Sequence, residues 1–94
     1  MDNKTEEFYR RLTEELAGSA DWPALYLFKF IVPSDDQKIQ TVENAFNNMG
    51  AVIETSKSKT GKYTSVSINV KMQGPEAIVE KYKQLSVIEG IISL

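Results

Sequence analysis

The clearest pattern in the sequence is the alternation of polar and apolar side chains from Ser65 to Val70. A period of two is typical of a β-strand that packs one face on a core and leaves the other face open. The pattern predicts a strand over residues 62–72, with Val66, Ile68, Val70 and Met72 on the core. The side chains predicted on the open face are those of Tyr63, Ser65, Ser67 and Asn69.

Residues 21–33 predict a second and more apolar strand, "DWPALYLFKFIVP". The segment is rich in aromatic and β-branched residues and lies between two prolines, as strands often do. Nearly continuous hydrophobicity indicates a central strand. One face is expected to carry Leu25, Leu27, Lys29 and Ile31, and the opposite face Tyr26, Phe28, Phe30 and Val32.

Three segments have the helical period of apolar positions, and they cover residues 5–16, 34–50 and 74–85. Thr5 is the expected N-cap of the first helix and Gly18 its stop. Ser34 and Gln37 form a capping box for the second helix, and Pro75 suits the first turn of the third. Two shorter strands are expected over residues 51–58 and 86–94, the latter with a bulge at Gly90.

The resulting order is a helix followed by β-α-β-β-α-β, which is the split βαβ, ferredoxin-like arrangement. We therefore predict an α+β ferredoxin-like sandwich, with an antiparallel sheet of strand order 4-1-3-2 and both domain helices on one face. The N-terminal helix and linker take residues 1–20, and one domain takes residues 21–94. Residues 57–62 form the predicted hairpin loop, which contains Gly61.

The composition excludes most kinds of catalysis, because the side chains that they commonly need are missing. The 94 residues include no cysteine and no histidine, so thiolate chemistry and the commonest general base and metal ligand are absent. Asp35 and Asp36 are adjacent carboxylates, but they lie in a first helical turn, where acidic residues are common. No nucleotide-binding, nucleophile or zinc motif is present. We expect a protein that is not an enzyme and needs no cofactor or metal.

The charge and the hydropathy of the chain argue against two classes of partner, nucleic acids and membranes. The net charge of −2 and one tyrosine on the open face argue against nucleic acid, whose readers need a basic surface and stacked aromatic side chains. The apolar runs are shorter than a membrane span, and the N-terminus lacks a signal-type apolar stretch. These observations predict a cytoplasmic protein without a membrane partner.

Two segments carry a family resemblance. "WPALYLFKF" (22–30) and the hairpin "SKTGKYTSVSINV" (58–70) resemble motifs of the YbeD-like family of small bacterial proteins, which has no established biochemical function. The resemblance covers residues 22–94 and implies a fold similar to ACT domains, the regulatory modules that bind amino acids. The hairpin here carries one extra residue, Thr60, so its loop is expected to differ from that of the family.

The candidate binding residues follow from the expected open face. Lys29 interrupts an apolar strand, and its ammonium must reach either solvent or a partner. Lys59 is central among the basic residues of the hairpin tip, where a solvated loop is the alternative explanation. The ligand-binding candidates are Lys29, Tyr63, Ser65, Ser67 and Lys59.

The function favoured by these residues is a non-enzymatic regulatory module that binds a small metabolite in the ACT manner. The alternative is an adaptor that binds a protein partner through the open sheet face or an edge strand. The apolar open face needs a cover. That cover is either the N-terminal helix, through Phe8, Leu12 and Leu16, or a second copy of the chain in a homodimer.

Overall fold

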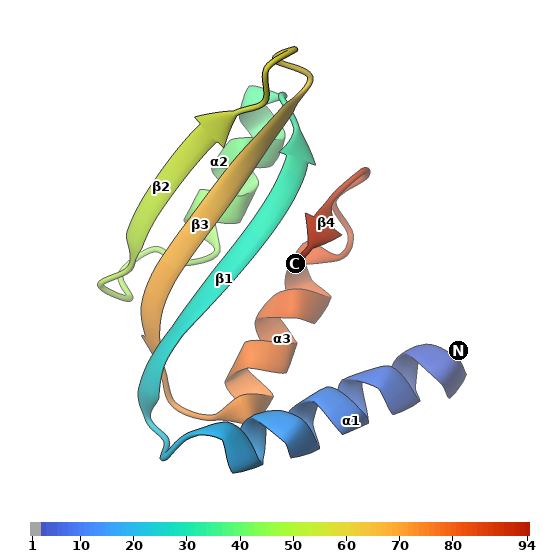
Figure 1. Cartoon of the computed structure of the whole chain (residues 1–94), viewed down its shortest axis with the longest axis vertical. Helices are drawn as coiled ribbons and strands as arrows, with labels where there is room; N and C mark the ends of the chain where they lie inside the picture. Colours follow the sequence, from blue (N-terminus) through green and yellow to red (C-terminus); the bar gives the residue numbers. More distant parts are fainter. Residues whose placement is uncertain (1–2) are drawn as a thin grey trace.

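The computed structural model describes residues 3–94, which form three helices and four strands (Figure 1). In chain order the elements are α1 (Asn3–Ser19), β1 (Ala24–Pro33), α2 (Asp36–Asn44), β2 (Val52–Lys57), β3 (Tyr63–Met72), α3 (Pro75–Leu85) and β4 (Ile92–Ser93).

The four strands form one antiparallel sheet in the order β2-β3-β1-β4. This confirms the predicted order 4-1-3-2 and the α+β class. β1 and β3 pair along their whole length, from Ala24 opposite Met72 to Pro33 opposite Tyr63. In the view of Figure 1, α2 lies behind the sheet and α3 lies beside β1, and no helix crosses in front of β1, β2 and β3.

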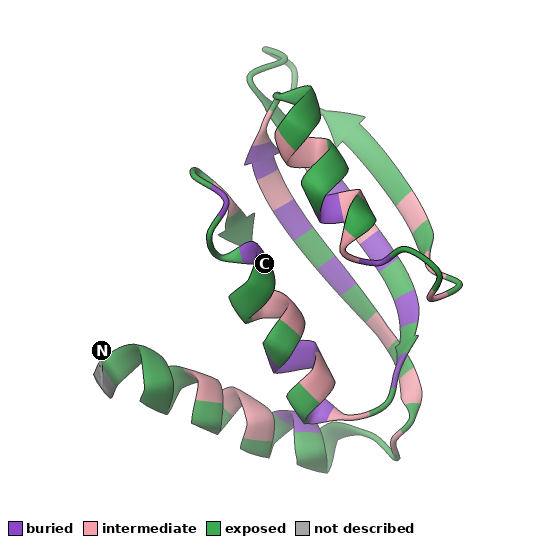
Figure 2. Cartoon of the chain, turned by 180° about the vertical axis from the view of Figure 1, so that it is seen from behind, coloured by how far each residue is buried: buried purple, intermediate pink, exposed green. Residues whose placement is uncertain are grey.

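The core lies between the sheet and these two helices. Buried and exposed residues alternate along β1 and β3, as the stripes on the strands in Figure 2 show. The face assignments predicted for both strands are confirmed. The buried core residues on these elements include Phe28, Phe30, Val32, Val66, Ile68, Val70, Met72, Val42, Ile78, Val79 and Leu85, and Phe46 joins them from the turn after α2.

Helix α1 packs beside α3 and does not cover the open face (Figure 1). Leu16 is buried in the core, and the Trp22 indole Nε1 donates a hydrogen bond of 3.0 Å to the Leu16 carbonyl oxygen. The Lys83 ammonium lies 5.3 Å from the centre of the Tyr9 ring. The first of the two predicted covers is therefore wrong, because the apolar stripe of α1 is directed at α3 and the core.

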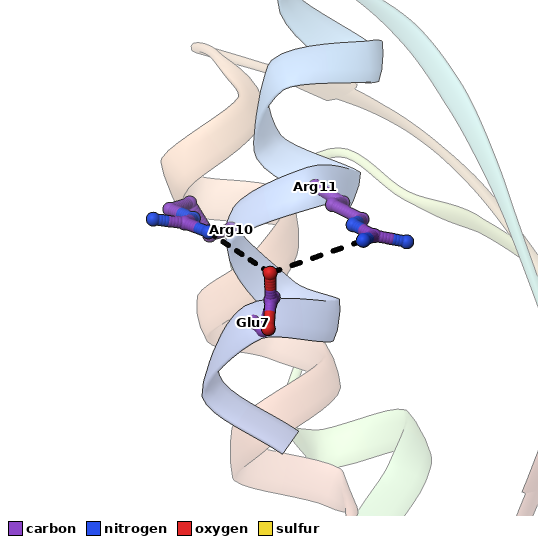
Figure 3. Close-up of polar contacts among 3 residues, drawn as sticks. All are labelled: Glu7, Arg10 and Arg11. Carbon is purple, nitrogen blue, oxygen red and sulfur yellow. Dashed lines mark hydrogen bonds and ion pairs between the residues drawn. The ribbon is translucent and has the colours of Figure 1, made fainter. Parts of the chain in front are cut away.

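The boundaries of α1 also differ from the prediction. The helix includes Thr5 and continues through Gly18, so neither residue caps it. On its exposed side, one Glu7 carboxylate oxygen accepts a hydrogen bond from Arg10 Nη2 at 3.2 Å, and Arg11 Nη2 lies 3.8 Å away (Figure 3). Exposed pairs of this kind stabilise a helix only slightly.

The N-cap of α2 is Asp35, not Ser34. The Asp35 carboxylate accepts hydrogen bonds from the backbone N–H groups of Gln37 and Lys38, at 2.9 and 3.3 Å. The Ser34 hydroxyl instead shares a hydrogen bond of 2.8 Å with the buried hydroxyl of Thr64 on β3. The predicted capping box is wrong because a tertiary contact takes the serine.

The last strand is much shorter than predicted. Residues 86–91 form turns, and the strand is limited to Ile92 and Ser93, which pair with Ile31 and Phe30. Gly90 has φ of +84° and lies in the turn before β4 rather than at a bulge within a strand. The predicted strand over residues 86–94 is therefore wrong over most of its length.

Candidate functional site

The open face of the sheet brings together four of the five predicted candidate residues. The cross-strand register places Lys29 opposite Ser67, Ile31 opposite Ser65, and Pro33 opposite Tyr63. Because these residues have the same parity on paired strands, their side chains share the face away from α2 and α3. Lys59 lies in the hairpin loop between β2 and β3 and is not part of this face.

The most complete polar arrangement is a row across three strands. Lys29 on β1 is level with Ser67 on β3, which is level with Glu54 on β2. A depression of about 370 Å³ lies over this row and over the neighbouring row of Leu27, Asn69 and Val52. Within residues 3–94, the Lys29 ammonium and the Glu54 carboxylate have no ion-pair partner. A positive and a negative group are therefore available on one apolar surface.

Glu54 and Asn69 belong to this arrangement but were not among the predicted candidates. Asn69 was placed on the open face without a role. Glu54 lies on a strand without the alternation of β3, because Val52 and Ile53 are adjacent apolar residues and the residues after them are polar. The signal is weak there because few apolar residues mark which face is which.

A second depression, of about 430 Å³, lies at the hairpin end of the open face. Its lining includes Tyr63 and Ser65 on β3, Ile31 on the neighbouring strand β1, and Ile92 on β4 beyond it. The Ser65 hydroxyl donates a hydrogen bond of 3.3 Å to the backbone oxygen of Ser56, so its own proton is already used. The predicted candidates are thus divided between two depressions that are both open to solvent.

The hairpin loop that carries Lys59 is held by its own backbone. Ser58 N donates to the Tyr63 oxygen at 2.8 Å, and Gly61 N donates to the Ser58 oxygen at 2.9 Å. Gly61 has φ of +75°, a conformation that suits glycine. The extra residue Thr60 contributes its hydroxyl oxygen, which accepts from the Lys62 N–H at 3.5 Å. The Lys59 side chain itself is exposed.

The open face is also apolar. Leu25, Leu27 and Val52 are 73%, 58% and 63% exposed, and they lie on one side of the Lys29–Ser67–Glu54 row, with Leu27 and Val52 in the adjacent row and Leu25 in the row after it. Small soluble proteins seldom leave such side chains grouped on one surface unless that surface has a partner. The row can therefore offer one charge of each sign beside an apolar contact area.

A separate groove of about 360 Å³ lies between α1, α3 and the C-terminal segment. Phe8, Tyr9 and Leu12 line it from α1. At its other wall the hydroxyls of Tyr26 and Tyr82 share a hydrogen bond of 2.9 Å. Burial raises the pKa of the Tyr82 hydroxyl well above its ordinary value, and the hydrogen bond to Tyr26 raises it further. Tyr82 therefore stays neutral and remains a hydrogen-bonding group rather than an anion.

Residues 3–94 also lack two features that would point to a function. No group of three or more histidine, cysteine, aspartate or glutamate residues in this range could hold a metal ion. In the same range, no helix has both the length and the apolar character needed to cross a bilayer.

Comparison with known proteins yields one match. A family described as "Protein of unknown function (DUF493)" matches residues 19–94, which is most of the chain. Neither a curated protein nor a solved structure matches the chain significantly. The match agrees with the resemblance to a family without an established function, and it leaves most of α1 outside the matched region.

Proposed function

Because the chain belongs to the DUF493 family of proteins of unknown function, we propose a function from its own residues: a non-enzymatic module that binds a protein partner through the open face of its sheet. The observation that carries this proposal is the exposure of Leu25, Leu27 and Val52 beside the Lys29–Ser67–Glu54 row. The occupant that we favour is a second copy of the chain.

The shape of the open face supports a protein partner over a small ligand. Small-molecule sites enclose most of their ligand and direct several polar groups at it. Here the two depressions are open to solvent, and the candidate hydroxyls lie in separate depressions. A long, open surface with apolar side chains around one charged row is better suited to another folded surface.

The order of the elements supports a regulatory role by analogy. We infer that the β-α-β-β-α-β order, with strand order 4-1-3-2, is a ferredoxin-like arrangement of the ACT-like kind. Fold analogy alone does not assign a function, so the residues of the open face carry the proposal.

Photo-crosslinking tests the open face in the organism that makes the protein. A photoreactive amino acid that replaces Leu27 is expected to give a crosslinked species, because Leu27 lies in the middle of the proposed interface. The matched control places the same amino acid at Val87, which is 82% exposed and lies outside the sheet. We expect a crosslinked product of twice the chain mass from position 27 and no crosslinked product from position 87.

The absence of any crosslink from position 27, or equal products from both positions, would contradict a function of the open face. A product of another mass from position 27 alone would keep the proposed function and change the partner.

A small-metabolite function is the second candidate, and it is supported by the groove between α1 and α3 rather than by the open face. This groove is lined by apolar side chains and presents the Tyr26–Tyr82 hydroxyl pair, so it suits an apolar compound with one hydrogen-bonding group. The test is a thermal-unfolding screen against amino acids, organic acids, nucleotides and acyl cofactors.

A compound at about 100 times its dissociation constant stabilises the native state by roughly 2.7 kcal/mol, which raises the midpoint of a domain of this size by several degrees. A compound of the groove is expected to stabilise a Leu27→Asp variant as much as the wild type. A compound that loses its effect in this variant would instead place the metabolite on the open face. A screen without any rise would contradict this second function.

A further inference from the structure

The charges on the open face are arranged symmetrically about β3. Ser67 is the middle residue of the row, with Lys29 on the strand to one side and Glu54 on the strand to the other. Neighbouring strands are about 4.8 Å apart, so the two charged residues start at equal distances from β3 on opposite sides. A rotation that exchanges the two sides of β3 therefore exchanges the positive and the negative position.

Resting on the proposed function, we propose that two copies of this chain pack face to face through their open faces, about a two-fold axis that runs nearly parallel to β3. This axis lies in the plane between the two sheets, and it places β1 of each copy over β2 of the other. Lys29 then faces Glu54 of the second copy, and Glu54 faces Lys29 of the second copy. One interface contains two such charge pairs.

The same rotation also brings the apolar residues of the next row along the strands into contact with each other. It contains Leu27 on β1, Asn69 on β3 and Val52 on β2. Leu27 of one copy faces Val52 of the other, so both exposed apolar side chains lose their contact with water. Asn69 lies close to the axis and faces Asn69 of the second copy. Its amide group can both donate and accept a hydrogen bond there.

The charges select this axis over the other two-fold that packs the same faces. An axis at right angles to the strands, through the same row, would place Lys29 over Lys29 and Glu54 over Glu54. Like charges in contact across an interface are strongly unfavourable. The row of three residues therefore specifies the orientation of the two copies as well as the surface that they share.

The area available predicts a weak and reversible dimer. β1 and β3 have ten residues each and β2 has six. With a rise of about 3.4 Å per residue and a strand spacing of about 4.8 Å, the footprint is about 400 Å² on each copy, which is below the standard size of a stable interface and is typical of a weak contact. Association in the micromolar range is the expected result.

Lys71 is the one further charged residue on this face of β3, and it lies at the end of the strand. Packed sheets cross at about −30°, which moves the ends of the strands sideways relative to each other. This crossing separates Lys71 from its copy and keeps both ammonium groups at the solvent-exposed rim.

The test uses charge reversal and sedimentation velocity over a range of concentrations. The variants Lys29→Glu and Glu54→Lys each place like charges at both contacts, so each alone is expected to dimerise more than tenfold more weakly than the wild type. An equimolar mixture of the two variants is expected to recover the dimer, because every contact between unlike copies then joins opposite charges. Lys59→Glu makes the same charge change outside the face and is expected to dimerise like the wild type.

Thermal unfolding of each variant shows that it is folded before its association is compared. The proposal is overturned if the mixture stays monomeric, if either variant alone dimerises like the wild type, or if the wild type is monomeric throughout. Failure of the dimer is distinguishable from failure of the proposed function. If the dimer is absent but position 27 crosslinks to a chain of another mass, the open face still binds a partner. If the dimer and the crosslink from position 27 are both absent, the proposed function is wrong as well.

Discussion

A Phe28→Ala variant is expected to lose about 3–5 kcal/mol of unfolding free energy, the usual cost of removing a buried phenylalanine side chain. Phe28 is fully buried, and its ring lies between 4.8 and 5.9 Å, centre to centre, from the rings of Tyr26, Phe30, Phe46 and Tyr82. The alanine would leave a cavity at the place where β1, α2 and α3 meet.

The loss is large for a domain of this size, since small proteins have a total stability of roughly 5–15 kcal/mol. Urea denaturation followed by circular dichroism measures it. The matched control is Phe8→Ala, which removes the same atoms from a side chain that is 62% exposed on α1. That variant is expected to lose less than about 1 kcal/mol. Equal losses in the two variants would contradict the assignment of the core.

A Gly90→Ala variant is expected to be destabilised by more than the ordinary cost of a left-handed residue, which is about 1–3 kcal/mol. Gly90 has φ of +84°, and a Cβ at this position would lie 2.8 Å from Pro33 Cγ. The neighbouring residue of the turn is also in contact with α2, because the Lys38 ammonium donates a hydrogen bond of 3.0 Å to the Glu89 carbonyl oxygen.

Gly50 is the matched control for the backbone part of this effect. It has φ of +70°, and a Cβ there would meet no atom within 4 Å. Gly50→Ala is expected to show the backbone cost alone, and Gly90→Ala a larger loss together with faster hydrogen exchange at the Leu94 amide, which bonds to the Lys29 carbonyl oxygen at 2.9 Å. Equal losses of unfolding free energy at the two glycines would show that the contact between the added Cβ and Pro33 does not affect stability.

The sheet could be predicted from the sequence because its signals are local and repeated. Along β3 each polar residue from Ser65 onward is followed by an apolar one, so the two faces of the strand follow from the alternation itself. β1 is apolar on both sides, yet Lys29 still marks the face that is open. These two strands carry most of the candidate surface, and their faces were predicted correctly.

The errors arise where a distant residue decides a local choice. Ser34 and Asp35 are both good N-caps, and the hydroxyl of Thr64, far along the chain, takes the serine and leaves the aspartate as the cap. The segment 86–94 is as apolar as a strand, but Gly90 bends it against Pro33. The position of α1 beside α3 depends on Leu16 and Tyr9 meeting residues that no nearby pattern identifies.

Only part of the candidate surface could be predicted, because some of its residues also depend on contacts between distant segments. Lys29 and Ser67 stand out on strands with clear periods, whereas Glu54 lies on a short edge strand with two large apolar residues, Val52 and Ile53. Its significance depends on the register between β2 and β3, which places it level with Ser67. Only the assembled sheet shows that the positive and negative groups lie on opposite sides of one strand.

The central claim is that the open face of the sheet is a surface for association. The most direct measurement follows the backbone amide resonances of the wild type during dilution from about 1 mM, a concentration that detects association as weak as about −4 kcal/mol. We expect shifts that depend on concentration and are confined to β1, β2 and β3, around Leu27, Lys29 and Glu54. Resonances that do not change, or changes grouped on α2 and α3, would contradict it.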